Sequence, residues 1–224
     1  MCGRYTLTSL PEEIRVEFDV EVPPEYGPRY NIAPSQPVPV LGAGADGKPR
    51  LAVMRWGLVP FWAASPKDVP HSINARAETL LEKPMFRDAF LQRRCLVIAD
   101  GFYEWRRTGG ARQPFRFHRL DERPFTFAGI WDRWRSPEGD TLYSCAIVTT
   151  GANSVVNPIH DRMPVIIDAA DRALWLDNSA DPAHLAGKLG TAEYASFEAY
   201  PVSTLVNSVA NDTADCIAAV PGVS

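Results

Sequence analysis

The second residue of the chain is a cysteine, and this position gives it a chemistry that internal cysteines lack. Removal of Met1, which is usual when the next residue is small, leaves Cys2 with a free α-amine and a thiol on adjacent carbons. An α-amine has a pKa of about 7.7–8.0, so more of it is neutral and nucleophilic near pH 7 than of a lysine amine. Such an aminothiol condenses with an aldehyde to an imine, and the thiol then closes a thiazolidine ring by an intramolecular step.

Two other roles for Cys2 are open on this evidence. Its thiolate can attack a carbonyl, as in an N-terminal-nucleophile amidase, or its side chain can fill the core at the start of a first strand. The other cysteines are Cys95, Cys145 and Cys216, and no pair has the C-x-x-C spacing of a zinc ribbon or redox dithiol. Reduced thiols in a cytoplasmic protein without a bound metal are therefore expected.

Glu104 is the second residue with a candidate chemistry, and it stands in the aromatic segment GFYEW. Strand alternation places Glu104 and Phe102 on one face, with Tyr103 and Trp105 on the other. A carboxyl group between aromatic rings is partly desolvated, which raises its pKa toward neutrality and suits a general acid or base. The alternative is a surface glutamate at a strand edge.

A histidine and an asparagine extend this set. His160 lies in a loop between two prolines, where the acidic and basic residues that follow it can tune the imidazole. A solvated or structural loop histidine is the alternative. In an extended segment, Asn74 shares a face with Arg76 and Glu78, and an amide beside a guanidinium can hold a sugar or a phosphate. A loop cap with a surface ion pair explains the same residues.

The charge of the chain is unevenly distributed. Residues 1–135 have 20 Lys and Arg against 16 Asp and Glu, whereas residues 136–224 have 3 against 11. The overall charge of −4 argues against a general polyanion binder, but 19 of the 23 basic residues are arginine. Arginine suits bidentate contacts with phosphate, although a GC-rich genome also favours arginine codons. A local phosphate-binding surface is therefore compatible with the composition.

Exposed aromatic residues accompany some of these arginines. Arg4, Arg76 and Arg162 lie in the segments described above, and Phe61 and Trp62 stand in a loop bounded by proline. Guanidinium groups that follow a phosphate backbone, next to rings on which bases stack, are typical of proteins that bind single-stranded nucleic acid.

The elements that position these residues are mostly strands. No apolar run approaches the length of a membrane span, and no secretory signal is expected at the N-terminus. Many consecutive strands with helices at the periphery indicate a single α+β domain over residues 1–224 with a largely antiparallel sheet. Strands are expected at residues 1–8, 50–56, 95–99, 102–106, 114–118, 125–130 and 141–148. Helices are expected at 9–18, where Ser9–Glu12 forms a capping box, at 84–91, and after Asp168 and Asp181. Loops are expected at 22–39 and 60–71, and a hairpin turn at Gly109-Gly110.

Six segments occur in one order along almost the whole chain, and together they resemble one family. They are MCGRY at residues 1–5, RYNIAP at 29–34, WGLVP at 56–60, NARAET at 74–79, GFYEW at 101–105 and HDRMP at 160–164. This set closely resembles the SOS response-associated peptidase (SRAP) family, whose members sense abasic sites in single-stranded DNA. Asn207 and the pair Asn211-Asp212 also fit the family pattern.

The resemblance implies a mechanism and a fold. The mature Cys2, freed by self-cleavage of Met1, would form a thiazolidine DNA–protein crosslink with the ring-opened abasic aldehyde and so protect the lesion, with lyase-type activity as a further expectation. The implied fold is compact and α+β, with curved, barrel-like antiparallel sheets and one positively charged groove. No metal, cofactor or membrane is implied, and a cytoplasmic monomer that joins the nucleoid when bound to DNA is expected. The implied catalytic residues are Cys2, Asn74, Glu104 and His160, and the implied DNA contacts are Arg4, Pro34, Trp62, Arg76 and Arg162.

The match departs from the family at one position, because Phe61-Trp62 stands where some members have paired tryptophans. The detail of base stacking is therefore open. Two other functions also remain: a thiol peptidase or amidase that uses Cys2, and a single-strand DNA-binding protein without covalent chemistry.

Overall fold

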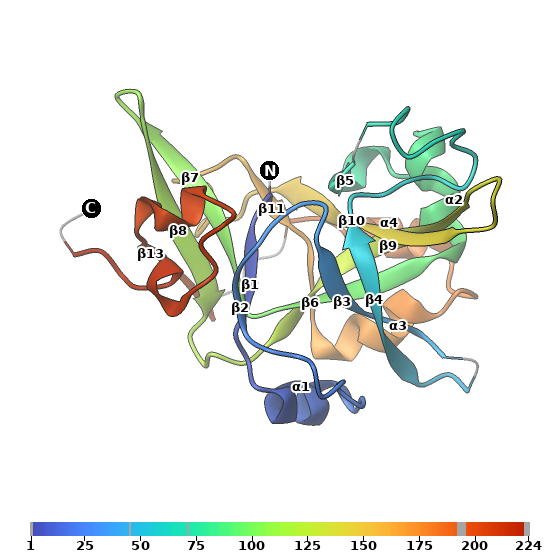
Figure 1. Ribbon diagram of the computed structural model, residues 1–224, viewed down its shortest axis with the longest axis horizontal. Helices are drawn as coiled ribbons and strands as arrows, with labels where there is room; N and C mark the ends of the chain where they lie inside the picture. The colour runs from blue at the N-terminus through green and yellow to red at the C-terminus, as the bar shows by residue number, and fades with distance from the viewer. Residues whose placement is uncertain (1, 45, 71, 192–195, 222–224) are drawn as a thin grey trace.

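A closed barrel of five strands forms the centre of the molecule in the computed structural model, which describes residues 2–44, 46–70, 72–191 and 196–221 (Figure 1). Each strand pairs with the next around the barrel, and the contact between the last and the first closes it. All these pairs are antiparallel except the short parallel contact of β10 with β4, so the barrel is mixed. In spatial order the strands are β10 (Thr141–Gly151), β4 (Pro49–Trp56), β3 (Pro37–Ala43), β6 (Arg94–Ala99) and β9 (Phe125–Arg135).

Three short strands lengthen the barrel sheet, and two of them flank the same end of β10. β5 (Asn74–Arg76) pairs with β10 in parallel, and β11 (Arg162–Pro164) pairs with it antiparallel. β12 (Ile166–Ile167) pairs with β9. The carboxyl end of β10 is therefore a point where residues from distant parts of the sequence meet.

A second, antiparallel sheet packs against the barrel through aromatic side chains. The rings of Tyr5 and Phe102 in this sheet both contact Phe127 of the barrel, and Tyr5 also contacts Trp56. β1 lies inside the sheet, so the start of the chain is held between two partners. In spatial order its strands are β13 (Phe197–Pro201), β8 (Ala111–Arg119), β7 (Gly101–Thr108), β1 (Tyr5–Leu7) and β2 (Arg29–Ile32).

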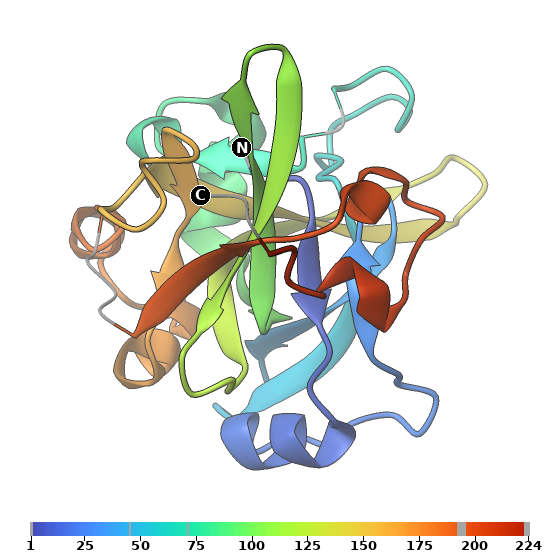
Figure 2. The same cartoon turned by 90° about the vertical axis from the view of Figure 1, so that its left-hand side faces the viewer.

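The helices are short and lie around the sheets (Figures 1 and 2). None of those in the described residues has the length and apolar character to cross a bilayer. They are α1 (Pro11–Phe18), α2 (Pro84–Gln92), α3 (Arg172–Leu176) and α4 (Pro182–Gly187), with 3-10 turns η1 (Ala77–Thr79), η2 (Ala169–Asp171), η3 (Thr204–Asn207) and η4 (Ala214–Cys216). The expected α+β class on curved, largely antiparallel sheets is confirmed.

The expected loop at residues 22–39 was wrong in part, because two strands begin within it. β2 is an edge strand that pairs only with β1, and β3 starts at Pro37. Proline is excluded from strand interiors because it cannot donate to a ladder. Here β6 pairs with β3 only at Val40 and Leu41, so Pro37 and Pro39 lie beyond the part of β3 that needs donors on both sides.

The expected capping box at Ser9 was also wrong by one residue. The N-cap of α1 is Leu10, whose backbone N–H donates to the carboxylate of Glu13 at 2.6 Å. The Ser9 hydroxyl instead donates to Asp100. Glu12 forms an exposed ion pair with Arg15.

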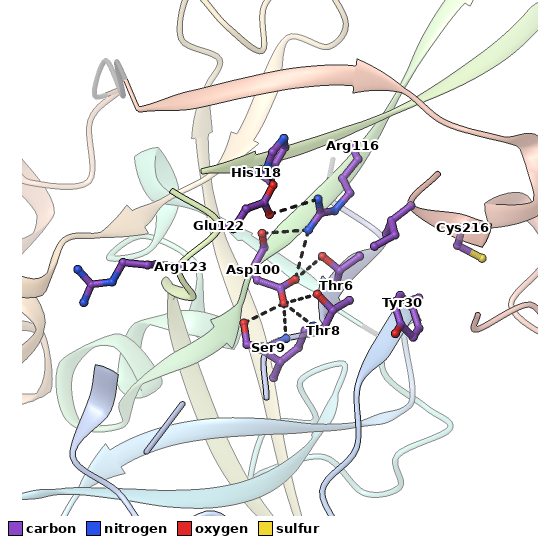
Figure 3. A network of polar contacts seen from close by, with 12 residues as sticks. Thr6, Thr8, Ser9, Tyr30, Asp100, Arg116, His118, Glu122, Arg123 and Cys216 are labelled. Atoms are coloured by element: carbon purple, nitrogen blue, oxygen red, sulfur yellow. Dashed lines mark hydrogen bonds and ion pairs between the residues drawn. The ribbon is translucent and has the colours of Figure 1, made fainter. Parts of the chain in front are cut away.

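Asp100 fixes the direction of β1, and with it the place of Cys2 (Figure 3). This buried carboxylate accepts hydrogen bonds from the hydroxyls of Thr6 at 2.6 Å and Thr8 at 2.9 Å, and from the backbone N–H of Ser9 at 2.7 Å. The buried guanidinium of Arg116 lies 3.6 Å away and balances its charge. A Cβ on Gly101 would come within 2.8 Å of Arg116, so this close packing requires glycine.

Candidate active site

Cys2 lies just before β1 and is completely buried. Asn74, at the start of β5, donates from its side-chain Nδ2 to the backbone carbonyl of Cys2 at 2.8 Å. The other atom of this amide, Asn74 Oδ1, is buried and has no hydrogen-bond partner among the described residues. A buried acceptor without a donor is costly, so Asn74 Oδ1 is suited to accept from a hydroxyl or amine of a bound molecule.

The pairing of β7 with β1 places Glu104 beside the first residues of the chain. Tyr5 pairs with Phe102, and the N–H of Tyr103 donates to the carbonyl of Arg4 at 3.0 Å. Glu104 is only 2% exposed, and burial raises its pKa to about 7. A desolvated carboxyl with a raised pKa agrees with what the sequence predicts, and its role as an acid or base stays a prediction. A group that is half protonated near neutral pH can donate and accept protons.

His160 faces Glu104 across a short gap. Its Nε2 lies 3.9 Å from Glu104 Oε2, which is too long for a hydrogen bond, and both side chains line the same cleft. Its Nδ1 accepts from the Arg162 N–H at 2.9 Å and also lies 3.1 Å from Asp161 Oδ1. Both neutral tautomers are therefore stabilised, and Nε2 can accept or donate a proton.

The same burial sets the protonation states of the site at neutral pH. Burial, and then the charge of Glu104, raise the pKa of the Cys2 thiol well above its ordinary value, so this thiol is neutral. Burial lowers the pKa of His160 below its ordinary value, so the imidazole is mostly neutral as well. The site thus has a neutral base beside a carboxyl group that can act as an acid.

Glu104→Gln is expected to stabilise the protein at pH 8 but not at pH 4. The ordinary pKa of 4.5 rises to about 7 on folding, so stability falls as the pH rises from 4.5 to 7 and the folded state keeps a proton that the unfolded state has lost. That difference corresponds to about 3 kcal/mol above pH 7, which glutamine avoids because it carries no charge. Thermal unfolding of the wild type and the variant at pH 4, 6 and 8 measures the stability difference. A stability difference that does not change with pH contradicts the prediction.

Two arginines lie beside this site, at the carboxyl end of β10. Arg76 is exposed and pairs with Thr149 in the β5–β10 ladder. Arg162 pairs with Gly151 in the β11–β10 ladder, and its Nη2 donates to the carbonyl of Thr149 at 2.7 Å. Glu78 holds the Arg162 guanidinium in a two-point ion pair at 2.5 and 3.0 Å. To bind a phosphate, the Arg162 guanidinium must either give up its ion pair with Glu78 or contact both groups at once.

Arg4 makes several contacts within the protein. Its Nη1 donates to Asn31 Oδ1 at 2.9 Å and to the carbonyl of Val206 at 2.6 Å. Asn31 in turn donates to three backbone carbonyls of residues 206–211, and Asp212 accepts from the backbone N–H groups of Tyr30 and Asn31. Arg4 therefore joins the C-terminal segment to β2 and to the residues just before β1, and its contact with DNA stays a prediction.

The two remaining predicted DNA contacts lie on loops at the same end of the barrel strand β4. Pro34 is half-buried in the turn after β2, where the N–H of Ser35 donates to the carbonyl of Trp56 at 2.7 Å. The indole of Trp56 donates to the carbonyl of Ile73, next to Asn74, at 2.9 Å. Trp62, between β4 and β5, is 52% exposed and is free to stack on a base.

A cleft of about 560 Å³ opens between the β7–β8 hairpin and residues 158–161. Glu104 and His160 line it, together with Arg107 and Arg112 from the hairpin. Neither arginine is among the site residues predicted from the sequence. The sequence does show that the two arginines stand on either side of the predicted Gly109-Gly110 turn, and this places them together at the tip of a hairpin.

Comparison with known proteins places these segments in one family. The family model described as SOS response associated peptidase (SRAP) matches residues 1–209. The chain belongs to the SRAP family. Its resemblance to this family, drawn from six short segments, is confirmed.

Proteins similar to this chain come from bacteria and animals. The abasic site processing protein YoqW of Bacillus subtilis is 42% identical over 223 residues, which cover 97% of this chain and 99% of YoqW. The abasic site processing protein HMCES of Xenopus tropicalis is 34% identical over 268 residues, covering 98% of this chain and 78% of HMCES. A crystal structure of a Bacteroides thetaiotaomicron protein has a TM-score of 0.88 and 26% identity, and it covers 98% of this chain and 100% of its own.

Proposed function

We propose that this SRAP chain is an abasic site processing protein that binds single-stranded DNA and forms a covalent crosslink through the mature Cys2. The names of its relatives support abasic site processing. The observation that carries the covalent chemistry is the convergence of Cys2, Asn74, Glu104 and His160, from four distant segments, around the start of the chain.

The proposed reaction takes place in two steps, and its atoms balance. The neutral α-amine of Cys2 adds to the abasic aldehyde and loses one water to form an imine. The thiol then adds to the C=N carbon, so that sulfur bonds to carbon, the thiol proton goes to a neighbouring base, and nitrogen keeps the hydrogen it has in the protonated imine. Because the amine and thiol are on adjacent carbons, the second step is a ring closure favoured by proximity.

The neighbouring side chains have distinct roles in this scheme. Protonated Glu104 gives its proton to the leaving hydroxyl as water departs, and the resulting carboxylate takes the proton of the thiol during ring closure. His160 Nε2 takes the proton of the anomeric hydroxyl and returns it to the ring oxygen as the ring C–O bond of the closed abasic sugar breaks and the aldehyde forms. Asn74 donates to the Cys2 carbonyl and accepts a hydroxyl of the sugar at its unpaired Oδ1.

A thiol peptidase or amidase is the less favoured reading of the same residues. Such an enzyme attacks with a thiolate, and reactive cysteines have lowered pKa values. The pKa of Cys2 is instead raised by burial. An imine mechanism tolerates this, because the first nucleophile is the amine and the thiol needs a base only for ring closure.

The test of the proposal is the intact mass of the protein after incubation with abasic single-stranded DNA. The expected product has the mass of the protein without Met1 plus the oligonucleotide, minus one water, and it survives heating without a reducing agent. An imine alone hydrolyses under these conditions. Cleavage of a fluorogenic peptide panel, with no adduct on abasic DNA, would favour the peptidase.

His160→Ala is expected to slow crosslinking more on a natural abasic site than on a small open-chain aldehyde. A natural site is mostly ring-closed, whereas the small aldehyde has no ring to open and does not need this base. A positioned base contributes about 10²–10⁴-fold. Single-turnover rates on both substrates measure the difference, and equal slowing on both contradicts ring opening as the role of His160.

Arg76→Ala and Arg162→Ala are each expected to make DNA binding less dependent on salt. Each phosphate contact on a single strand contributes about −0.7 to the slope of log affinity against log salt. Three contacts predict a slope of about −2 for the wild type, and each variant should flatten it by about 0.7. Titrations at several salt concentrations measure the slope, and a wild-type slope near zero contradicts nucleic-acid binding.

Glu78→Gln is the matched control for Arg162. It leaves both arginines in place but removes the carboxylate that occupies the Arg162 guanidinium. This variant is expected to bind single-stranded DNA more tightly, which general damage to the site cannot produce.

A further inference from the structure

The tip of the β7–β8 hairpin has two positively charged side chains that make no stabilising contact among the described residues. Arg107 and Arg112 are directly opposite each other in the ladder between the two strands, just before and after the turn at Gly109 and Gly110. Like charges in this arrangement destabilise a hairpin. Both side chains are exposed, and neither has an ion-pair or hydrogen-bond partner among the described residues.

The hairpin projects from the second sheet, so its tip is accessible. In both views it extends beyond the rest of the molecule, at the end opposite α1 (Figures 1 and 2). Its inner side forms one wall of the 560 Å³ cleft that also holds Glu104 and His160. Three arginines and two carboxylates contribute to this cleft, so its charge favours an anion next to the reacting groups.

We propose that Arg107 and Arg112 form a second phosphate site, which binds a backbone phosphate of the damaged single strand next to the abasic nucleotide. This inference rests on the proposed function. A phosphate between the two guanidinium groups would accept hydrogen bonds from both and would cancel their repulsion. The site would act in addition to the contacts expected at Arg76 and Arg162, and would hold the strand on the hairpin side of the lesion.

The test compares the double variant Arg107→Ala/Arg112→Ala with a control of equal charge change. The control is Arg15→Ala/Arg50→Ala, because both arginines lie at the opposite end of the molecule, on α1 and at the start of β4. The probe is a single-stranded oligonucleotide with one central abasic-site analogue that cannot crosslink. We expect the hairpin variant to bind about tenfold more weakly, with a salt slope flatter by about 0.7, and the control to bind like the wild type.

Shortened probes locate the phosphate. The effect of the double variant should disappear when the nucleotides on one side of the lesion are removed, and persist when those on the other side are removed. An effect that depends on a complementary strand beside the lesion would assign the phosphate to duplex DNA and overturn the proposal. If the hairpin variant loses the same affinity with every probe, or if the control variant loses as much affinity, the effect is only general electrostatic attraction and the proposal is overturned.

Arg112→Glu keeps the test informative if the alanine variant folds poorly. Glutamate opposite Arg107 replaces a repulsive cross-strand pair with an attractive one. This variant is expected to have a higher melting temperature than the wild type and weaker DNA binding. Greater stability together with lower affinity cannot come from misfolding, whereas unchanged affinity would overturn the proposal.

The proposed function and this inference fail in different ways. If the wild type binds DNA but forms no crosslink with a natural abasic site, the covalent function fails and the hairpin comparison is still valid. If the wild type forms a crosslink and the hairpin variant binds as tightly as the wild type, only the phosphate site fails.

Discussion

Cys2→Ala is expected to form no heat-stable adduct with abasic single-stranded DNA at any incubation time. The variant keeps an N-terminal α-amine, so an imine still forms, but no thiol is available to close the ring. Its adduct should therefore appear only when borohydride traps the imine. Denaturing gels and intact mass with and without the reductant measure both species.

Non-covalent binding is the control for this result. The candidate phosphate contacts do not involve Cys2, so the variant should bind an abasic-site analogue within about twofold of the wild-type affinity. Protein that retains Met1 should also give no stable adduct, because its Cys2 nitrogen is part of a peptide bond. A heat-stable adduct from the Met1-retaining form would exclude the aminothiol mechanism.

Glu104→Gln is expected to slow crosslinking by about 10²–10⁴-fold, which is the usual contribution of a positioned acid or base. Glutamine keeps the shape of the side chain but cannot give up a proton. The pKa of Glu104 is about 7, so the acid form needed for loss of water is present below pH 7 and disappears above it. The neutral amine needed for addition increases up to and beyond pH 8.

These two requirements predict a bell-shaped pH profile with a maximum between about pH 7 and 8. The alkaline limb belongs to Glu104, so Glu104→Gln should lose it and its slow rate should rise with pH to a plateau. Single-turnover rates from pH 5.5 to 9 measure both profiles. A variant with the wild-type rate, or with the wild-type alkaline limb, would exclude Glu104 as the acid.

The short motifs predicted residues that the structure brings together, although their catalytic roles stay predictions. The alternation within GFYEW predicts a glutamate among aromatic rings, and Glu104 is buried with a raised pKa. The register of β7 against β1 was not predictable in the same way. It depends on Asp100, which the sequence shows only as an acidic residue before a glycine, and on its bonds to Thr6 and Thr8.

The partners of the arginines could not be predicted, because they depend on contacts between distant segments. Arg4 and Val206 are separated by 202 residues in sequence, yet their hydrogen bond is 2.6 Å long. The face shared by Asn74, Arg76 and Glu78 in an extended segment was only partly right. β5 ends at Arg76, and the following 3-10 turn directs Glu78 to Arg162.

The interior position of β1 has a consequence for the order of events during synthesis. Its neighbour β7 begins about a hundred residues later in the chain, and the carbonyls that hold Arg4 are later still, at residues 206 and 207. The amino terminus therefore leaves the ribosome long before the strands that bury Cys2 have been made. An aminopeptidase that acts on nascent chains therefore reaches the amino terminus before folding, whereas one that acts on the folded protein must reach it when Cys2 is already buried. If an aminopeptidase rather than self-cleavage removes Met1, the fraction of active molecules would be set by whether this removal precedes folding.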